Sequence, residues 1–206
     1  MQPNPSVSVF LESDPTEDPW VQGKPSPEIL TVVEPNVEWP RRYAQLAEKI
    51  RACLGERAID IHHVGSTAVH GLPSKDVIDI DLIVPDPGAE SNYIPALQTL
   101  GFVHTVREPS WYQHRMLRLE EPRVNLHVFG QQADEAVRHL LFRDWLRHHP
   151  EDSDRYASAK KQAVTSDPQS VTEYNERKHD VVRSIYSSIF AQLGLNPLPQ
   201  QPHTTN

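Results

Sequence analysis

The most regular alternation of hydrophobic and polar residues lies between residues 77 and 84. Aliphatic side chains there alternate with Asp79 and Asp81. Because successive side chains of a β-strand point to opposite faces, the pattern predicts a strand with one apolar face and two neighbouring carboxylates on the other. The aliphatic positions are Ile78, Ile80 and Leu82.

Beyond this strand, the pattern alternates between predicted strands and predicted helices. Short apolar runs predict strands at 29–33, 58–64, 102–107, 112–119 and 123–129. Apolar positions three or four residues apart predict helices at 39–54, 91–100, 132–148, 151–165 and 170–193. The connections between strands shorten after residue 102, which favours antiparallel pairing. The sequence therefore predicts an α/β (α+β) fold, a mixed β-sheet with flanking helices and a C-terminal helical cap.

Proline-rich composition marks both ends of the chain. Residues 1–28 contain six prolines and several acidic residues, which predicts a disordered or loosely packed tail. Residues 194–206 are predicted to form a second tail of the same kind. The 206 residues suffice for one globular domain, which we expect at 29–193.

Charge and composition narrow the class of partner. The formal net charge of −8 makes binding of bulk nucleic acid unexpected. The single cysteine, Cys53, excludes an internal disulfide and a cysteine-based zinc site. No apolar run is long enough for a membrane span, and the first 30 residues contain no apolar core of a secretory signal. We therefore expect a cytoplasmic protein that makes no membrane contact.

A glycine–serine turn precedes the Asp-x-Asp strand. Twelve residues separate Ser66 from Asp79. Gly65 and Ser66 could offer backbone N–H groups and a hydroxyl to a phosphate, while Asp79 and Asp81 suit Mg²⁺. Each half also has a structural explanation, an ordinary turn and a solvated strand face. The order and spacing of both halves resemble the nucleotidyltransferase superfamily, which implies a nucleoside triphosphate substrate and a nucleotidyltransferase-like sheet.

Two lysines and several other polar residues are further candidates. Lys178 falls within the apolar stripe of the last helix and Lys160 follows Tyr156 by one helical turn. Lysines facing inward either extend their ammonium groups to the surface or meet an anion such as a triphosphate. The remaining pocket candidates are Asn125, His127, His63 and Arg143. His63 has the alternative of a structural hydrogen-bonded histidine, and Arg143 that of a solvated helical side chain.

Denser motifs resemble the GrpB family, also called UPF0157, from about residue 32 to 192. They are the residues 63–69, Gly71-Leu72, Lys75, Ile78-Asp79-Ile80, Trp39-Pro40, Leu126-His127-Val128, 142–147 with Pro150, Tyr156 with Lys160, and Tyr174-Asn175 with Lys178. The resemblance implies a nucleotidyltransferase-like fold and adds Lys75 to the phosphate-binding candidates. The family usually has proline where this chain has His70 and Asp76, and Asp76 could pair with Lys75.

The resemblance leaves three functions open. The first is a metal-dependent transferase in which Asp79 and Asp81 hold Mg²⁺, while Gly65, Ser66, Lys75, Lys160 and Lys178 hold a triphosphate. Nucleotidyltransferases normally carry a third carboxylate on a later strand, where this chain offers Asn125 and His127, so His127 would act as the base. The acceptor would be a small molecule or a protein. The alternatives are a non-catalytic nucleotide-binding or regulatory module, and a repurposed acid–base pocket that uses no nucleotide.

Overall fold

A five-stranded mixed sheet forms the centre of the molecule. The computed structural model describes residues 4–195. The strand order is β1-β2-β5-β4-β3, in which β2 and β5 are parallel and the other neighbours antiparallel. The strands are β1 (Asp60–Val64), β2 (Ile78–Val84), β3 (Val103–Glu108), β4 (His114–Leu119) and β5 (Val124–Gly130). The predicted mixed sheet is confirmed, and each of these strands falls within two residues of its predicted bounds.

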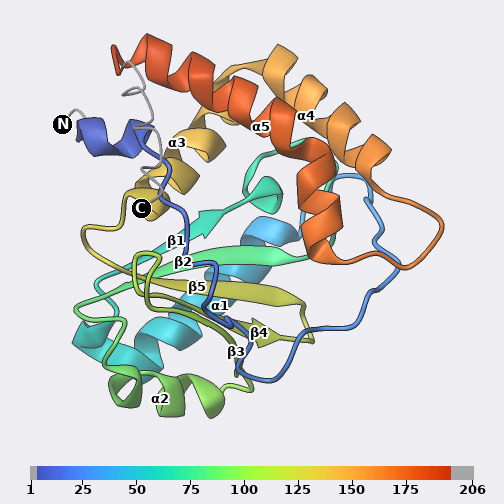
Figure 1. Cartoon of the computed structure of the whole chain (residues 1–206). Coiled ribbons are helices and arrows are strands. Elements are labelled where there is room, and N and C mark those ends of the chain that lie inside the picture. Colours follow the sequence, from blue (N-terminus) through green and yellow to red (C-terminus); the bar gives the residue numbers. More distant parts are fainter. Residues whose placement is uncertain (1–3, 196–206) are drawn as a thin grey trace.

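Helices cover both faces of the sheet (Figure 1). One face carries α1 (Trp39–Leu54) and the short α2 (Ile94–Gln98). The other face carries three helices that follow one another in the chain, α3 (Asp134–His148), α4 (Pro150–Ala163) and α5 (Val171–Gln192). These three form the predicted C-terminal helical cap. Short 3₁₀ turns complete the elements at Pro5–Ser8, Gly55–Arg57, Ser66–Ala68 and Glu90–Asn92.

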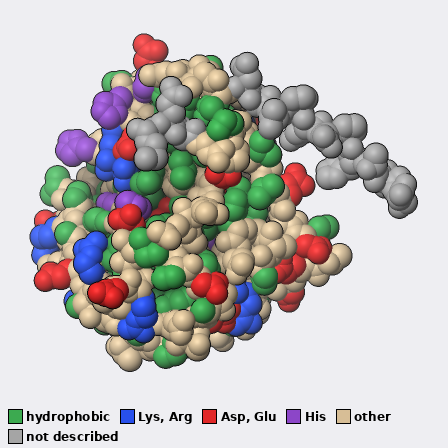
Figure 2. Space-filling model, turned by 90° about the vertical axis from the view of Figure 1, so that its left-hand side faces the viewer, with side chains coloured by type: hydrophobic (Ala, Val, Ile, Leu, Met, Phe, Trp, Pro, Cys, Tyr) green, Lys and Arg blue, Asp and Glu red, His purple; other side chains and the backbone are tan. Residues whose placement is uncertain are grey.

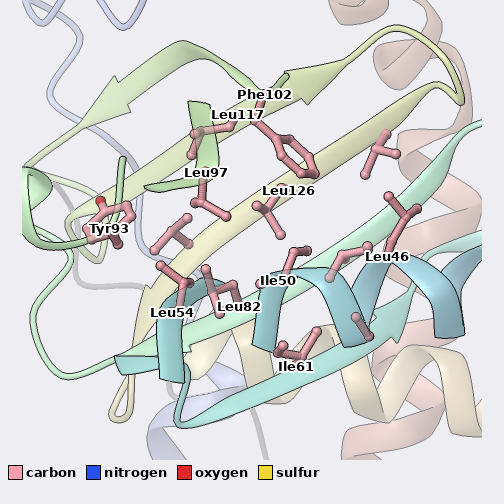
Figure 3. Packing of buried hydrophobic residues seen from close by; sticks show 14 of the residues in the cluster. Leu46, Ile50, Leu54, Ile61, Leu82, Tyr93, Leu97, Phe102, Leu117 and Leu126 are labelled. Atoms are coloured by element: carbon pink, nitrogen blue, oxygen red, sulfur yellow. The ribbon is translucent and has the colours of Figure 1, made fainter. Parts of the chain in front are cut away.

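The main hydrophobic core lies between the sheet and the α1–α2 layer. Ile80 of β2 and Ile50 of α1 are both fully buried, and Leu97 of α2 joins them. Figure 3 shows Ile50 of α1, Leu97 of α2 and Leu82 of β2 meeting between the helices and the strands. This face of β2 is therefore the apolar face that the alternation predicts.

Two predicted elements differ from the structure. Residues 29–33 form no strand. Val33 pairs with Ser74 in an isolated bridge, and Glu28, just before this range, pairs with Gln169 in another. The helix expected at 91–100 is reduced to α2 with a preceding 3₁₀ turn. Pro95 occupies its first turn and leaves little room for a longer helix before the turn at Gly101.

The N-terminal segment runs along the sheet on the side of α3–α5, opposite α1 (Figure 1). The sequence predicts a disordered or loosely packed tail at 1–28, whereas residues 4–28 make specific contacts. The fully buried Arg138 of α3 donates hydrogen bonds to the carbonyls of Val7 and Val9, each at 2.9 Å. Trp20 forms an isolated bridge with Val106 of β3. The predicted C-terminal tail lies outside the described residues, apart from Gly194 and Leu195.

The surface mixes charges of both signs. Figure 2 shows Lys and Arg side chains interspersed with Asp and Glu side chains on one face of the molecule. Within residues 4–195, no helix is long and apolar enough to cross a membrane.

Candidate functional site

A cavity of about 670 Å³ lies between the polar face of the sheet, helices α3–α5 and the N-terminal segment. Its floor comes from β2, β5 and β4, and its opposite wall comes from α4 and α5. Seven of the predicted site residues line it: Gly65, Ser66, Lys75, Asp79, His127, Lys160 and Lys178. Asn125 lines it as well. The structure therefore brings most of the predicted candidates together.

Asp79 reaches the cavity from the centre of the sheet. It is the register partner of Asn125 on β5, and the Asn125 amide donates a hydrogen bond of 2.8 Å to Asp79 Oδ1. Gly65 has a φ of +65°, and a Cβ there would collide with the Asp79 carboxylate, so this position requires glycine. Burial raises the pKa of Asp79, while Asn125 and the nearby Lys75 act in the opposite direction.

Asp81, in contrast, is buried beneath the side chain of a histidine. Its side chain is fully buried, and His139 Nδ1 of α3 lies 2.9 and 3.1 Å from its two oxygens. The other ring nitrogen of His139 lies 3.5 Å from Glu135 Oε1. Burial lowers the pKa of His139, but Asp81 and Glu135 outweigh it and raise the pKa to about 9. The second carboxylate of the Asp-x-Asp pair is thus neutralised by an imidazolium.

Three lysines from three elements surround two tyrosines at one end of the cavity. Lys75 Nζ lies 4.7 Å from the ring centre of Tyr174, and Lys160 Nζ lies 4.7 Å from that of Tyr156. Lys178 Nζ lies between the two rings, 5.1 Å from the centre of Tyr174 and 5.6 Å from that of Tyr156. The loop before β2, α4 and α5 each supply one lysine.

Burial makes this lysine cluster unusual. Lys160 is 1% exposed, and its ammonium group donates a hydrogen bond to the carbonyl of Pro73. Burial and, to a smaller extent, the charge of Lys178 lower the pKa of Lys160 to about 7, although Asp79 acts in the opposite direction. Burial lowers the pKa of Lys75 as well. Lys75 and Lys178 are half-buried beside the buried Lys160, and a bound anion would stabilise the ammonium form of these lysines.

A hydrogen-bonded series of side chains reaches the cavity at His127. The parallel pairing of β2 and β5 sets His127 opposite Asp81, on the same face as Asp79 and Asn125. His127 Nδ1 lies 3.0 Å from His114 Nε2 of β4. His114 Nδ1 lies in turn 2.8 Å from Glu108 Oε2 at the end of β3.

Two predicted pocket residues lie elsewhere. His63 shares the α1 face with Ile61, stacks on Tyr43 with ring centres 4.6 Å apart and bonds Thr67 Oγ1 at 3.0 Å. It is the structural histidine of the alternative interpretation. Arg143 of α3 donates to the carbonyl of His63 at 3.0 Å and anchors α3 to β1.

Asp76 does not pair with Lys75. Its carboxylate accepts hydrogen bonds from Trp39 Nε1 at 2.6 Å and from Arg42 at 2.9 Å, both on α1. Asp76 therefore fastens the loop before β2 to α1 and leaves Lys75 facing Tyr174.

Comparison with known proteins places the chain in a family. Residues 29–188 match the family described as GrpB protein. The chain belongs to the GrpB family. A UPF0157 protein of Halalkalibacterium halodurans is 38% identical over 162 residues, which cover 79% of this chain and 83% of that protein. The matched region begins where the N-terminal segment ends, so residues 4–28 add a cavity wall outside the family's matched part.

Solved structures agree with the fold. The crystal structure of the conserved protein GrpB from Enterococcus faecalis superposes with a TM-score of 0.68 and 24% identity, covering 79% of this chain and 98% of that one. A cytoplasmic RNA terminal U-transferase is more distant, with a TM-score of 0.44 and 12% identity over 63% of this chain and 42% of that one. The first of these similarities supports the fold of this GrpB protein.

The predicted magnesium site does not fit the residues present in this GrpB protein. Both oxygens of Asp81 already face His139, and its side chain has no exposed surface. Among the described residues, no group of three or more His, Cys, Asp or Glu side chains is arranged to hold a metal ion. Asp79 is the one carboxylate of the pair that faces the cavity.

Sequence reasoning missed three residues of the site. His139 pairs with Asp81 across 58 positions of the sequence, whereas Glu108 and His114 lie six residues apart at the facing ends of β3 and β4. His139 follows Glu135 by one helical turn, but nothing local connects either residue with Asp81. The alternation in β4 sets His114 on the same face as Met116, which pairs with His127. This alternation was the one local signal that could have placed His114 near His127.

Proposed function

We propose that this GrpB protein is a transferase of the nucleotidyltransferase type that binds a nucleoside triphosphate, or a similar phosphate-rich small molecule, in its cavity. The observation that carries the proposal is the convergence of Lys75, Lys160 and Lys178 beside Asp79. The chain has a net charge of −8, yet it brings one buried and two half-buried lysines together in this cavity. Phosphate oxygens would neutralise them and accept their hydrogen bonds.

The glycine–serine turn supports a phosphate position close to the lysines. Ser66 and Gly65 line the cavity next to Asp79, so the Ser66 hydroxyl is available to a phosphate that the lysines hold. The leaving phosphates would lie at the lysine end. Asp79 and His127 would face the acceptor group from the floor of the sheet, with Asp79 held in orientation by Asn125.

Charge stabilisation in this proposal comes from side chains. Lysines that are already in place can stabilise negative charge as it develops on the leaving phosphates, which lowers the barrier without a rearrangement of solvent. No step is assigned to Mg²⁺, because Asp81 is committed to His139. The net charge of −8 favours a small molecule or a protein segment as the acceptor over bulk nucleic acid. A nucleotide substrate agrees with the expected cytoplasmic location.

One observation favours a second function. The sealed Asp81 and the absence of a carboxylate at Asn125 and His127 leave Asp79 as the only cavity-facing carboxylate among these four positions. A non-catalytic module that binds the same phosphate ligand would need the lysines and would not need Asp79.

Calorimetry with the full chain tests the proposal. Pyrophosphate and the four nucleoside triphosphates are titrated with magnesium and with a chelator. The variants are Lys160→Met/Lys178→Met and, as the matched control, Lys161→Met. Lys161 also lies on α4, but it is exposed and pairs with Glu34 at 3.3 Å.

We expect binding without magnesium that the control keeps and the double variant loses. Wild-type protein that folds and binds none of these ligands would overturn the proposal. Turnover of the bound nucleotide that Asp79→Asn abolishes, with binding retained, would separate the transferase from the non-catalytic module.

A further inference from the structure

Three side chains from three adjacent strands form a continuous hydrogen-bonded series that ends in the cavity. Glu108 at the end of β3 bonds His114 at 2.8 Å, and His114 bonds His127 at 3.0 Å. The two imidazole rings stack with their centres 5.2 Å apart and an angle of 25° between their planes. Phe129 stacks on His114 at 4.8 Å and packs the series from β5.

When His114 carries one ring hydrogen, the chemistry of the groups fixes where the protons lie. An ionised carboxylate can only accept, so His114 Nδ1 carries a hydrogen for Glu108. A neutral His114 then has its lone pair on Nε2, and this atom can only accept a hydrogen bond from His127 Nδ1–H. The lone pair of His127 is thereby confined to Nε2.

The series is largely shielded from water and lies beside a third histidine, His139. The His114 side chain is 5% exposed. His139 of α3 approaches His127 from a different direction, with ring centres 5.7 Å apart, and its own carboxylate partners are Asp81 and Glu135. Burial, and after it the charge of His139, lower the pKa of His127 well below its usual value. His127 is therefore neutral near pH 7.

His127 Nε2 is the free end of the series. Within residues 4–195 this nitrogen has no hydrogen-bond partner, whereas Nδ1 is used by His114. His127 lines the cavity on the same sheet face as Asp79. A lone pair held at this position is suited to accept a proton from a bound molecule.

We propose that Glu108 and His114 are positioning residues that hold His127 in the tautomer whose Nε2 lone pair faces the cavity, so that His127 accepts the proton of the acceptor group. The use of this base rests on the proposed transferase function, whereas the tautomer itself does not. In the transfer step the acceptor O–H bond breaks and its proton passes to His127 Nε2. The acceptor oxygen forms a bond to phosphorus, and the bond from phosphorus to the leaving phosphate breaks, with the electron pair departing on that phosphate toward the lysines.

Nitrogen NMR of the histidine rings tests this proposal directly, because imidazole nitrogen shifts distinguish protonated from unprotonated ring atoms. The full chain is labelled with ¹⁵N in wild type, His114→Phe and Glu108→Gln. His114→Phe keeps a stacked ring but removes both nitrogens. Glu108→Gln keeps the shape but removes the obligate acceptor.

His104 provides an internal control in every spectrum. It is a buried histidine on β3 whose Nε2 lies 2.9 Å from the carbonyl of Val106, so its hydrogen must be on Nε2. We expect opposite tautomers in the wild type, with His127 protonated on Nδ1 and His104 on Nε2. In His114→Phe the proton of His127 should move to Nε2, the tautomer that free histidine prefers, while His104 stays unchanged.

Three results would overturn the proposal. The first is a wild-type His127 protonated on Nε2, and the second is an unchanged His127 tautomer in His114→Phe with His104 intact. If His114→Phe fails to fold, Glu108→Gln decides: a mixture of His127 tautomers supports the series, and an unchanged single tautomer contradicts it. Failure of the phosphate titrations would remove the transferase and leave these spectra as they are, so the two failures are distinguishable.

Discussion

The two faces of the central sheet are built from the same strands and have opposite character. On one face, β2 and β5 present Ile80 and Leu126, both fully buried against α1 and α2. On the other face, one residue along each strand, they present Asp79 and His127 to the cavity. The difference shows that one strand alternation supplies both the cohesion of the fold and its polar floor.

The strongest way to break this comparison is to truncate the apolar face. Ile80→Ala should lower the free energy of unfolding by about 2–5 kcal/mol, because it removes a fully buried side chain and leaves a cavity. Asp79→Asn, one position earlier, should keep or raise that free energy, since burial already disfavours the charged form and raises its pKa. Urea unfolding of both variants measures this, and an equal loss from both would contradict the division between the faces.

The ion pair beneath the cavity predicts a pH dependence of stability. The pKa of His139 is raised from 6.5 to about 9. The resulting stabilisation is therefore complete below pH 6.5 and is lost as the pH rises through 9, by at most about 3 kcal/mol. Urea midpoints measured from pH 6 to pH 10 test this. In Asp81→Asn, the decline in this interval should be much smaller, and an identical decline would mean that another group causes it.

Removing one lysine should separate stability from binding. Lys160→Met should leave the free energy of unfolding unchanged or higher, because it removes a buried cation that Lys178 repels. The same change should weaken pyrophosphate binding at least tenfold, or about 1.4 kcal/mol. Thermal melting and calorimetry measure the two quantities, with Lys161→Met as the control. A large loss of stability together with unchanged binding would make Lys160 a structural residue.

The smallest expected effect concerns the loop that carries Lys75. Asp76→Ala removes the hydrogen bonds from Trp39 and Arg42 and should lower the free energy of unfolding by about 1 kcal/mol. Pyrophosphate affinity should stay within twofold of the wild type, because Lys75 contacts Tyr174 and not Asp76. A strong loss of affinity would show that the loop position, and not only the lysine, determines binding.

The sequence predicted what depends on local periodicity. Alternation assigned Asp79 and Asp81 to one face of a strand, and the helical stripe singled out Lys178. His127 was a candidate on a later strand, and the structure pairs that strand with β2.

What depends on partners distant in sequence was not predictable in this way. Both aspartates carry the same local signal, and only His139 of α3 makes Asp81 a buried ion pair while Asp79 stays in the cavity. The proline-rich composition of residues 1–28 suggested a loose tail. Its contacts with the body of the protein could not be predicted from local sequence, because its partner Arg138 lies more than a hundred residues away. His63 was a candidate with a structural alternative, and the structure sets it on the apolar face together with Ile61.

The most direct test of the central claim is the titration of Lys160 by NMR, in the free protein and with pyrophosphate. The account predicts a pKa of about 7 in the free protein, because burial and Lys178 disfavour the ammonium form. With pyrophosphate among the lysines, the pKa of Lys160 should rise toward the usual value for lysine, and proton uptake should accompany binding at neutral pH. An unchanged Lys160 titration at saturating pyrophosphate would contradict a phosphate site at the lysine end of the cavity.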